Sequence, residues 1–259
     1  MSRATHDRLR ERRDRLSRSM ILLMMAALSS GHFVVRLVQV DGVAHRYQVW
    51  IPPNYDASQK WPAILFLHGS GERGDEGEKQ TMVGLGPALR EGKVDGSAVI
   101  VFPQCPADQR WAGNAWSIAI AALDQAEREW SIDRRRVSLT GMSMGGAGVW
   151  ILAAKYPKRW SAIAPVCGYV HRPPSLPDAE SPTTESFAGF AQHLPPIPIW
   201  IFHGSDDPVV PVTESRGIAD VLGANATYTE FPHVGHNAWD PAYRTTGVIS
   251  WLLKQKRKR

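Results

Sequence analysis

The pattern of hydrophobic positions becomes regular at residue 33 and opens with two strand-like stretches. Residues 33–40 and 43–51 are rich in β-branched and aromatic side chains, and the dipeptide Asp41-Gly42 lies between them. This dipeptide strongly favours the tight turn of a two-residue hairpin. We therefore expect two antiparallel strands at the start of the folded body.

Short, uninterrupted apolar runs then alternate with helical patterns. The predicted strands are residues 63–67, 98–102, 137–140, 162–166, 197–202 and 226–231, and the predicted helices lie near 85–91, 116–130, 144–155, 213–222 and 242–254. Uninterrupted apolar runs are typical of strands covered on both faces, and strands that alternate with helices indicate a mostly parallel sheet. The sequence therefore predicts an α/β fold: a mostly parallel, eight-stranded sheet with helices on both faces and an antiparallel N-terminal hairpin.

One segment, residues 171–196, departs from this alternation. It is rich in proline, serine, threonine and glutamate and has no clear period, so we interpret it as a surface loop or small lid between two strands. No internal repeat and no interdomain linker is evident. We expect a single domain over residues 32–253, followed by a basic tail at 254–259.

The first 31 residues differ from the rest of the chain. An arginine-rich stretch leads into the nine apolar residues 20–28 and then into small residues. This order resembles a signal peptide, but we favour a disordered, non-native or mispredicted leader, and the apolar run is too short to span a bilayer. We favour a cytoplasmic location, with a secreted or periplasmic one if residues 1–29 are a signal peptide.

The charge of the chain is concentrated at its ends. The formal net charge is +5 over 259 residues, but residues 1–19 carry a balance of +4, residues 254–259 carry +5 and the intervening body carries −4. A fold that binds nucleic acid usually carries its basic patch on the body, so we expect no nucleic-acid partner. We also expect no cofactor and no metal, because no residue cluster has metal-ligand spacing and no glycine-rich loop has a phosphate-binding pattern.

The strongest chemical signal is the stretch GMSMGG at residues 141–146, which contains Ser143. It follows a predicted strand and opens a predicted helix. A G-x-S-x-G motif in that setting indicates a nucleophile elbow, a strained turn that exposes the serine hydroxyl at a helix N-terminus. Ser143 is therefore the candidate nucleophile.

A serine hydroxyl needs a base, and the base needs a carboxylate that orients it. Two neighbouring carboxylates, Asp206 and Asp207, follow the predicted strand at 197–202, and two histidines, His233 and His236, follow the last strand. Side chains that follow parallel strands gather at one edge of the sheet. The residues alone leave both choices open.

Six stretches of the chain resemble the α/β-hydrolase superfamily, in its esterase, dienelactone-hydrolase and prolyl-oligopeptidase-like branch. They are YQVWIPPNYD, LFLHGSGERGD, VFPQCP, LTGMSMGGAGVW, IFHGSDDPVVP and VGHNAWDPAY, and they span residues 47–243. Within that branch the chain is most similar to the predicted peptidase or phospholipase/carboxylesterase group. The resemblance implies an α/β-hydrolase fold.

The resemblance also implies a role for individual residues. In the family's patterns the acid aligns with Asp207 and the base with His236, which leaves Asp206 as a neighbour. The two backbone N–H groups of the oxyanion hole align with Met144 and with Ser70, with Gly69 as the alternative to Ser70. If the family's strand order holds, Cys105 and Cys167 lie too far apart for a disulfide and are free thiols.

Other residues near the expected pocket are candidates for substrate binding. Glu72 belongs to a charged loop after the strand at 63–67, and Gln104 follows the strand at 98–102. Trp111 and Trp239 could line an apolar pocket, although aromatic residues more often belong to the core. His68 and His203 are interpreted as structural.

These residues predict a serine hydrolase of the carboxylesterase type that acts on small-molecule esters. One alternative is a serine peptidase of the prolyl oligopeptidase-like type that acts on short peptides. Another is a non-catalytic binding module built on a hydrolase scaffold. The sequence indicates no oligomeric state.

Overall fold

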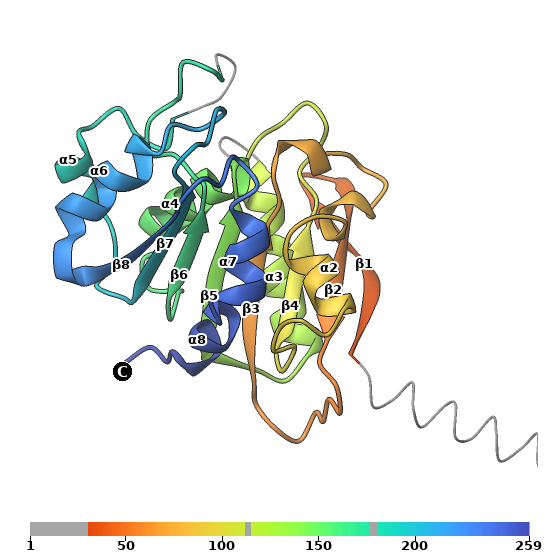
Figure 1. Ribbon diagram of the computed structural model, residues 1–259. Helices are drawn as coiled ribbons and strands as arrows, with labels where there is room; N and C mark the ends of the chain where they lie inside the picture. Colours follow the sequence, from red (N-terminus) through yellow and green to blue (C-terminus); the bar gives the residue numbers. More distant parts are fainter. Residues whose placement is uncertain (1–30, 112–114, 177–180, 259) are drawn as a thin grey trace, which may run out of the picture.

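The computed structural model describes residues 31–111, 115–176 and 181–258 (Figure 1). The predicted leader, residues 1–31, lies outside these ranges except for Gly31. In the described ranges, no helix has the length and apolar character needed to cross a lipid bilayer.

The chain enters the fold through the expected hairpin. Strands β1 (His32–Val40) and β2 (Val43–Ile51) pair antiparallel, with Val40 opposite Val43. The two turn residues between them, Asp41 and Gly42, both have positive φ, at 49° and 81°. A two-residue turn of this type requires positive φ at both positions, which Asp-Gly tolerates well.

Eight strands form one sheet in the order β1-β2-β4-β3-β5-β6-β7-β8. The remaining strands are β3 (Trp61–Leu67), β4 (Val99–Pro103), β5 (Ile132–Met142), β6 (Ile163–Val166), β7 (Ile199–Gly204) and β8 (Ala226–Phe231). Strands β3 to β8 run parallel to one another, and β2 joins β4 in antiparallel orientation. The predicted mostly parallel sheet with an antiparallel N-terminal hairpin is confirmed.

Helices cover both faces of this sheet, as Figure 1 shows. One face carries α2 (Leu85–Arg90), α7 (Trp239–Thr245) and α8 (Val248–Lys254), and the other carries α3 (Ala115–Glu129), α4 (Met144–Lys155), α5 (Phe187–Ala191) and α6 (Thr213–Leu222). Short 3-10 turns lie at η1 (Ser70–Glu72), η2 (Lys79–Thr81) and η3 (Gly223–Asn225). Successive residues of a strand point to opposite faces, so Leu65 belongs to one core and Phe66 to the other.

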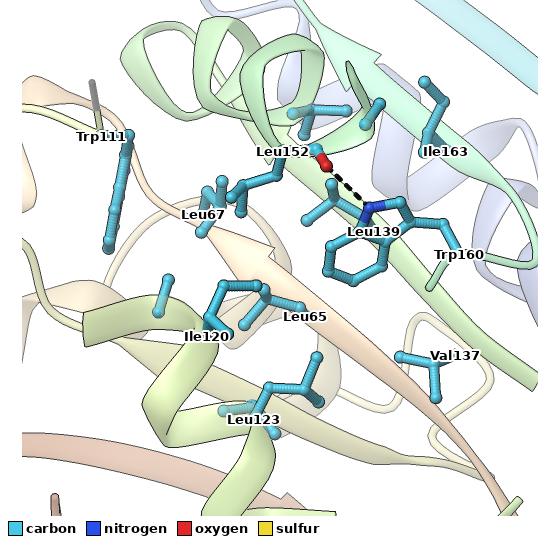
Figure 2. Close-up of a cluster of buried hydrophobic side chains, with 14 of the residues drawn as sticks. Leu65, Leu67, Trp111, Ile120, Leu123, Val137, Leu139, Leu152, Trp160 and Ile163 are labelled. Carbon is cyan, nitrogen blue, oxygen red and sulfur yellow. Dashed lines mark hydrogen bonds between the residues drawn. The ribbon is translucent and has the colours of Figure 1, made fainter. Parts of the chain in front are cut away.

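The core between the sheet and helices α3 and α4 is built from large apolar side chains (Figure 2). Leu65 and Leu139 from neighbouring strands pack there with Leu123 from α3. Trp160 is fully buried in the same cluster, and its indole N–H donates to the carbonyl oxygen of Leu152 at 2.9 Å. Burial of this ring therefore leaves no unpaired donor.

Several elements differ from the sequence-based expectation. The predicted helix at 242–254 is two helices, because the chain breaks at Gly247, which has a φ of 73°. A short helix, α5, lies within the segment predicted as loop or lid. Strand β5 begins at Ile132 instead of residue 137, because Ile132 already pairs with Trp61 of β3 before the register shifts and Val137 pairs with Ala63.

The parallel strands bring residues distant in sequence to one edge of the sheet. Ser143 directly follows β5, Asp207 follows β7, and His236 follows β8. The loop after β3, residues 68–73, ends at the same edge because β3 and β5 are neighbours with Leu67 opposite Gly141. Cys105 and Cys167 are free and buried. Cys105 follows β4 and Cys167 follows β6, and strands β3 and β5 lie between these two strands in the sheet.

Candidate active site

Ser143 occupies a strained turn between β5 and α4. Its backbone has a φ of 53° and a ψ of −118°, a conformation that costs a non-glycine residue free energy. The N–H of Ser143 donates to the carbonyl oxygen of Val166 at 2.9 Å, which ties the turn to the neighbouring strand. The predicted strand-turn-helix setting of the G-x-S-x-G motif is thus present.

The glycines of the motif are required by close backbone contacts. A Cβ on Gly145 would lie 2.0 Å from the carbonyl oxygen of Leu67, and one on Gly141 would lie 2.6 Å from that of Gly145. Both distances are far shorter than van der Waals contact. Only glycine lets helix α4 start this close to β3, and that approach places the free N–H groups of its first turn beside Ser143.

His236 links Ser143 to a carboxylate. Its Nε2 lies 2.8 Å from the hydroxyl oxygen of Ser143, and its Nδ1 lies 2.7 Å from Oδ2 of Asp207. Because the carboxylate can only accept, Nδ1–H donates to it and Nε2 is left to accept from the serine. The ring of Trp239 packs edge-on against the imidazole at 5.4 Å and limits its rotation.

The side chain of Asp207 is fully buried and surrounded by donors. Its Oδ1 accepts from the N–H groups of Val209 and Val210 at 2.8 and 2.9 Å, and its Oδ2 lies 3.2 Å from Nε2 of His203 and 2.7 Å from Nδ1 of His236. Burial by itself would raise the pKa of Asp207. The hydrogen bonds from His203, His236 and Val210 outweigh burial and hold that pKa well below its ordinary value, so the carboxylate stays ionised.

The competing candidates face solvent instead. The side chain of Asp206 is 59% exposed and that of His233 is 93% exposed. Oδ2 of Asp206 lies 3.7 Å from Nδ1 of His233. Among the hydrogen bonds of the described residues, neither side chain bonds to Ser143, His236 or Asp207. The hydrogen-bonded chain therefore runs through Asp207 and His236.

The loop after β3 lies against Ser143 and is held by His68. The N–H of Cys105 donates to Nε2 of His68 at 3.0 Å, so Nδ1–H of His68 donates to the carbonyl oxygen of Gly69 at 2.6 Å. Burial lowers the pKa of His68 to about 4, which keeps the ring neutral. These bonds attach the loop containing Ser70 to the end of β4.

Helix α4 supplies the second candidate donor of the oxyanion hole. Met144 is the first residue of α4, so its N–H has no partner within the helix. The positive end of the helix dipole lies at the same point. A negative charge beside Ser143 would be stabilised there.

The four candidate substrate-binding residues lie in different surroundings. Glu72 is partly buried next to Gly69, and Trp239 contacts His236. Gln104 is 2% exposed, and its amide bonds the backbone of Glu72 and Gly77, so it holds the loop. Trp111 belongs to the core and donates to the carbonyl oxygen of His68. A direct role in binding stays a prediction for all four.

Cys167 also lies at this site, and sequence reasoning assigned it no role beyond a free thiol. It has a positive φ of 39°, and its sulfur lies within 4.8 Å of ligand atoms of Asp207 and His236. Three such groups could bind a metal. Burial raises the pKa of the Cys167 thiol well above its ordinary value. Nδ1 of His236 and Oδ2 of Asp207 are, however, already hydrogen-bonded to each other at 2.7 Å. The arrangement favours the hydrogen-bonded chain.

The sequence matches a protein family described as "Putative esterase" over residues 43–231. Among curated proteins, the "Putative esterase NocK" of Nocardia uniformis subsp. tsuyamanensis is 29% identical over 223 residues, which cover 83% of this chain and 57% of that protein. An "Uncharacterized secreted protein" of Arthroderma benhamiae is 28% identical over 227 residues, which cover 76% of this chain and 23% of that protein. The chain thus spans only part of these relatives.

Solved structures give a consistent result. The crystal structure of a thermostable esterase is 28% identical and superposes with a TM-score of 0.73, covering 87% of this chain and 63% of the other. The feruloyl esterase module of Clostridium thermocellum superposes with a TM-score of 0.68 at 14% identity, covering 89% and 91%. At 14% identity, the similarity to the feruloyl esterase module shows a shared fold alone.

Proposed function

Because this chain belongs to the Esterase family and has the α/β-hydrolase fold, we propose that it is a serine hydrolase that cleaves carboxylic esters. Ser143 is the nucleophile, His236 is the general base and acid, and Asp207 orients the base. The observation that carries the proposal is the continuous chain of hydrogen bonds from Ser143 through His236 to the buried Asp207. An activated serine needs this arrangement.

The geometry supports a two-step acyl transfer. Nε2 of His236 takes the hydroxyl proton as the oxygen of Ser143 attacks the ester carbonyl carbon. The imidazolium then gives that proton to the alkoxide of the departing alcohol, and an acyl-serine remains. Water, deprotonated by the same imidazole, then attacks the carbonyl carbon of the acyl-serine. The imidazolium returns that proton to the departing oxygen of Ser143, which releases the acid and restores the free hydroxyl.

Two features would stabilise the charged intermediates. The ionised Asp207, whose hydrogen bonds hold its pKa low, favours the imidazolium form of His236. The negative oxygen of the tetrahedral intermediate would accept from the N–H groups of Met144 and Ser70, where removal of one such donor typically costs about 100-fold in rate or more. No step requires a cofactor or a metal.

Ester substrates are favoured over peptides by the relatives. NocK is described as an esterase, and the solved structure at 28% identity is a thermostable esterase. A peptidase of the prolyl oligopeptidase-like type uses the same triad, so it stays the alternative. Small-molecule esters are the proposed substrates.

The test compares purified wild type with Ser143→Ala on nitrophenyl esters of increasing acyl length, beside aminoacyl, feruloyl and short peptide substrates. Ser58→Ala, which removes an exposed hydroxyl bonded to Asp56, is the matched control. We expect Ser143→Ala to lose about 1,000-fold or more in kcat and the control to keep full activity. Retention of most ester hydrolysis by Ser143→Ala would contradict the proposal, and activity on peptides alone would contradict the substrate class.

The location of the protein is a separate proposal. The relative from Arthroderma benhamiae described as secreted supports the signal-peptide interpretation of residues 1–29 over the cytoplasmic one. Sequencing the N-terminus of the mature protein in its host distinguishes them: a start near residue 30 supports export, and an intact leader supports the cytoplasm.

A further inference from the structure

A carboxylate lies beside the proposed oxyanion hole. A Cβ placed on Gly69 would lie 3.0 Å from Oε2 of Glu72 and 3.7 Å from Cβ of Ser143. Both distances start from the same Cβ position on Gly69. The carboxylate oxygen of Glu72 therefore lies no farther than their sum, about 6.7 Å, from Cβ of Ser143. Glu72 thus lies beside the nucleophile.

The backbone around Glu72 is anchored. The N–H of Glu72 donates to the carbonyl oxygen of Gly69 at 3.4 Å, and its own carbonyl oxygen accepts from Nε2 of Gln104 at 3.1 Å. Gln104 is buried and also accepts from the N–H of Gly77 at 2.6 Å. The protein therefore places this carboxylate at the site and does not leave it on a free surface loop.

No cation of the described residues compensates the charge of Glu72. The neighbouring Arg73 directs its guanidinium to the carbonyl oxygens of Ser70 and Gln109. The groups that act on the pKa of Glu72 are its burial, which raises it, and the N–H groups of Gly69 and Glu72, which lower it in part. Glu72 is only partly buried, so it can still meet a ligand.

An uncompensated carboxylate here opposes catalysis on a neutral ester. Attack on the ester makes the carbonyl oxygen negative, and a second negative charge no farther than about 6.7 Å from Cβ of the attacking Ser143 repels it. At an effective dielectric constant near 20 such a repulsion slows the reaction by about 100-fold, which solvent screening reduces toward about tenfold. A positive charge on the substrate would remove this penalty.

We propose that Glu72 makes the site selective for esters that carry an ammonium group close to the scissile carbonyl. The ammonium pairs with the carboxylate of Glu72 and, by its position, also stabilises the negative carbonyl oxygen. The inference rests on the proposed ester hydrolysis at Ser143 and adds the substrate class. An amine on the acyl part and a quaternary ammonium on the alcohol part share this chemistry.

Two pairs of equally shaped esters test the inference by titration of the released acid at neutral pH. Ethyl 3-aminopropanoate against ethyl butanoate places the charge on the acyl part, and acetylcholine against 3,3-dimethylbutyl acetate places it on the alcohol part. The enzymes are wild type, Glu72→Gln, and the control Glu78→Gln, which removes an exposed carboxylate of the same loop. Rates are normalised to hydroxide-catalysed hydrolysis of each ester.

We expect wild type to prefer the charged member of at least one pair by tenfold or more, and that pair identifies where the ammonium lies. Glu72→Gln should reverse the pattern: kcat/KM falls about tenfold for the charged ester and rises about tenfold for its neutral partner. Glu78→Gln should leave both values unchanged. The wild-type preference alone keeps the inference testable if Glu72→Gln folds poorly.

Two results would overturn the inference while leaving ester hydrolysis intact. One is a wild type that cleaves both members of each pair equally or prefers the neutral ones. The other is a Glu72→Gln enzyme that slows charged and neutral esters by the same factor, which indicates a purely structural role. A wild type that cleaves none of the four esters overturns the proposed function as well.

Discussion

Replacing Asp207 by asparagine removes one buried negative charge and leaves the size of the side chain unchanged. The two oxygens of Asp207 have separate partners: the N–H groups of Val209 and Val210 hold Oδ1, and Oδ2 faces Nδ1 of His236 at 2.7 Å. The oxygen of asparagine would keep the two backbone bonds. Its NH₂ group would then point at His236.

The loss of rate has two causes that act in the same direction. An imidazolium and a carboxylate whose charge centres lie about 4 Å apart attract by about 4 kcal/mol at an effective dielectric constant near 20, which corresponds to about 1,000-fold in rate. An NH₂ group facing Nδ1 also favours the imidazole tautomer that carries its proton on Nε2, and this tautomer cannot accept the proton of Ser143. We expect kcat to fall by about 1,000- to 10,000-fold.

The assay is steady-state hydrolysis of a nitrophenyl ester by wild type, Asp207→Asn and Asp206→Asn. Asp206 is the matched control because it is the adjacent carboxylate, is 59% exposed, and lies beside the exposed His233. An exposed pair of this kind is worth little, so we expect Asp206→Asn to stay within about twofold of wild type. Equal losses in the two variants, or a kcat above a tenth of wild type for Asp207→Asn, would refute the reasoning.

Three further outcomes follow from burial, packing and charge. The pKa of Asp207 is lowered in the folded protein, so this carboxylate stabilises the fold above about pH 4 and loses that effect as the pH falls. Between about pH 5 and pH 2, the unfolding free energy of wild type should therefore fall by on the order of 2 kcal/mol more than that of Asp207→Asn, as measured by urea denaturation. No such relative loss would contradict the pKa direction. Gly145→Ala should prevent folding or cost more than about 3 kcal/mol, because its Cβ would lie 2.0 Å from a carbonyl oxygen, whereas Gly71→Ala meets nothing within 4 Å and should melt like wild type. The thiols of Cys105 and Cys167 are buried, and burial raises the pKa of Cys105 to about 12 and that of Cys167 well above its ordinary value. Ellman's reagent should therefore modify them only in denaturant. Rapid reaction of the native protein would contradict their burial.

The sheet could be predicted from the sequence because most of its strands contain short apolar runs that alternate with helical patterns, an order typical of a parallel sheet. The strand expected at 226–231 has the bounds of β8, and the hairpin turn at Asp41-Gly42 has the backbone that its residues favour. The last helix was harder to predict. Its apolar period continues through Gly247, so the break depends on a backbone conformation that the period does not record.

The candidate site could be predicted only in part. The glycines around Ser143 signal a close backbone approach, and the structure shows those contacts. The choice between Asp206 and Asp207 depends on which carboxylate turns inward toward Val209, Val210 and His236, and adjacent identical residues carry no local signal for that. Only the resemblance to a family favoured Asp207 from sequence.

Tertiary contacts explain why the surrounding residues were harder to assign. Gln104 is a predicted substrate-binding residue because it follows a strand, and in the structure its amide forms hydrogen bonds with Glu72, Glu76 and Gly77. The position of Glu72 depends on that same anchor. Neither contact has a short-range pattern, because the two segments lie about 30 residues apart in the chain.

The most direct test of the account is covalent labelling with a fluorophosphonate probe, read by intact mass and peptide mapping. The probe reacts with a serine only where a base activates it and an oxyanion hole accepts the negative oxygen. We predict one probe per chain on Ser143 of wild type, wild-type labelling of Asp206→Asn, and none of Ser143→Ala. A probe attached at another residue, or an unlabelled Ser143 in a protein that still hydrolyses esters, would contradict the account.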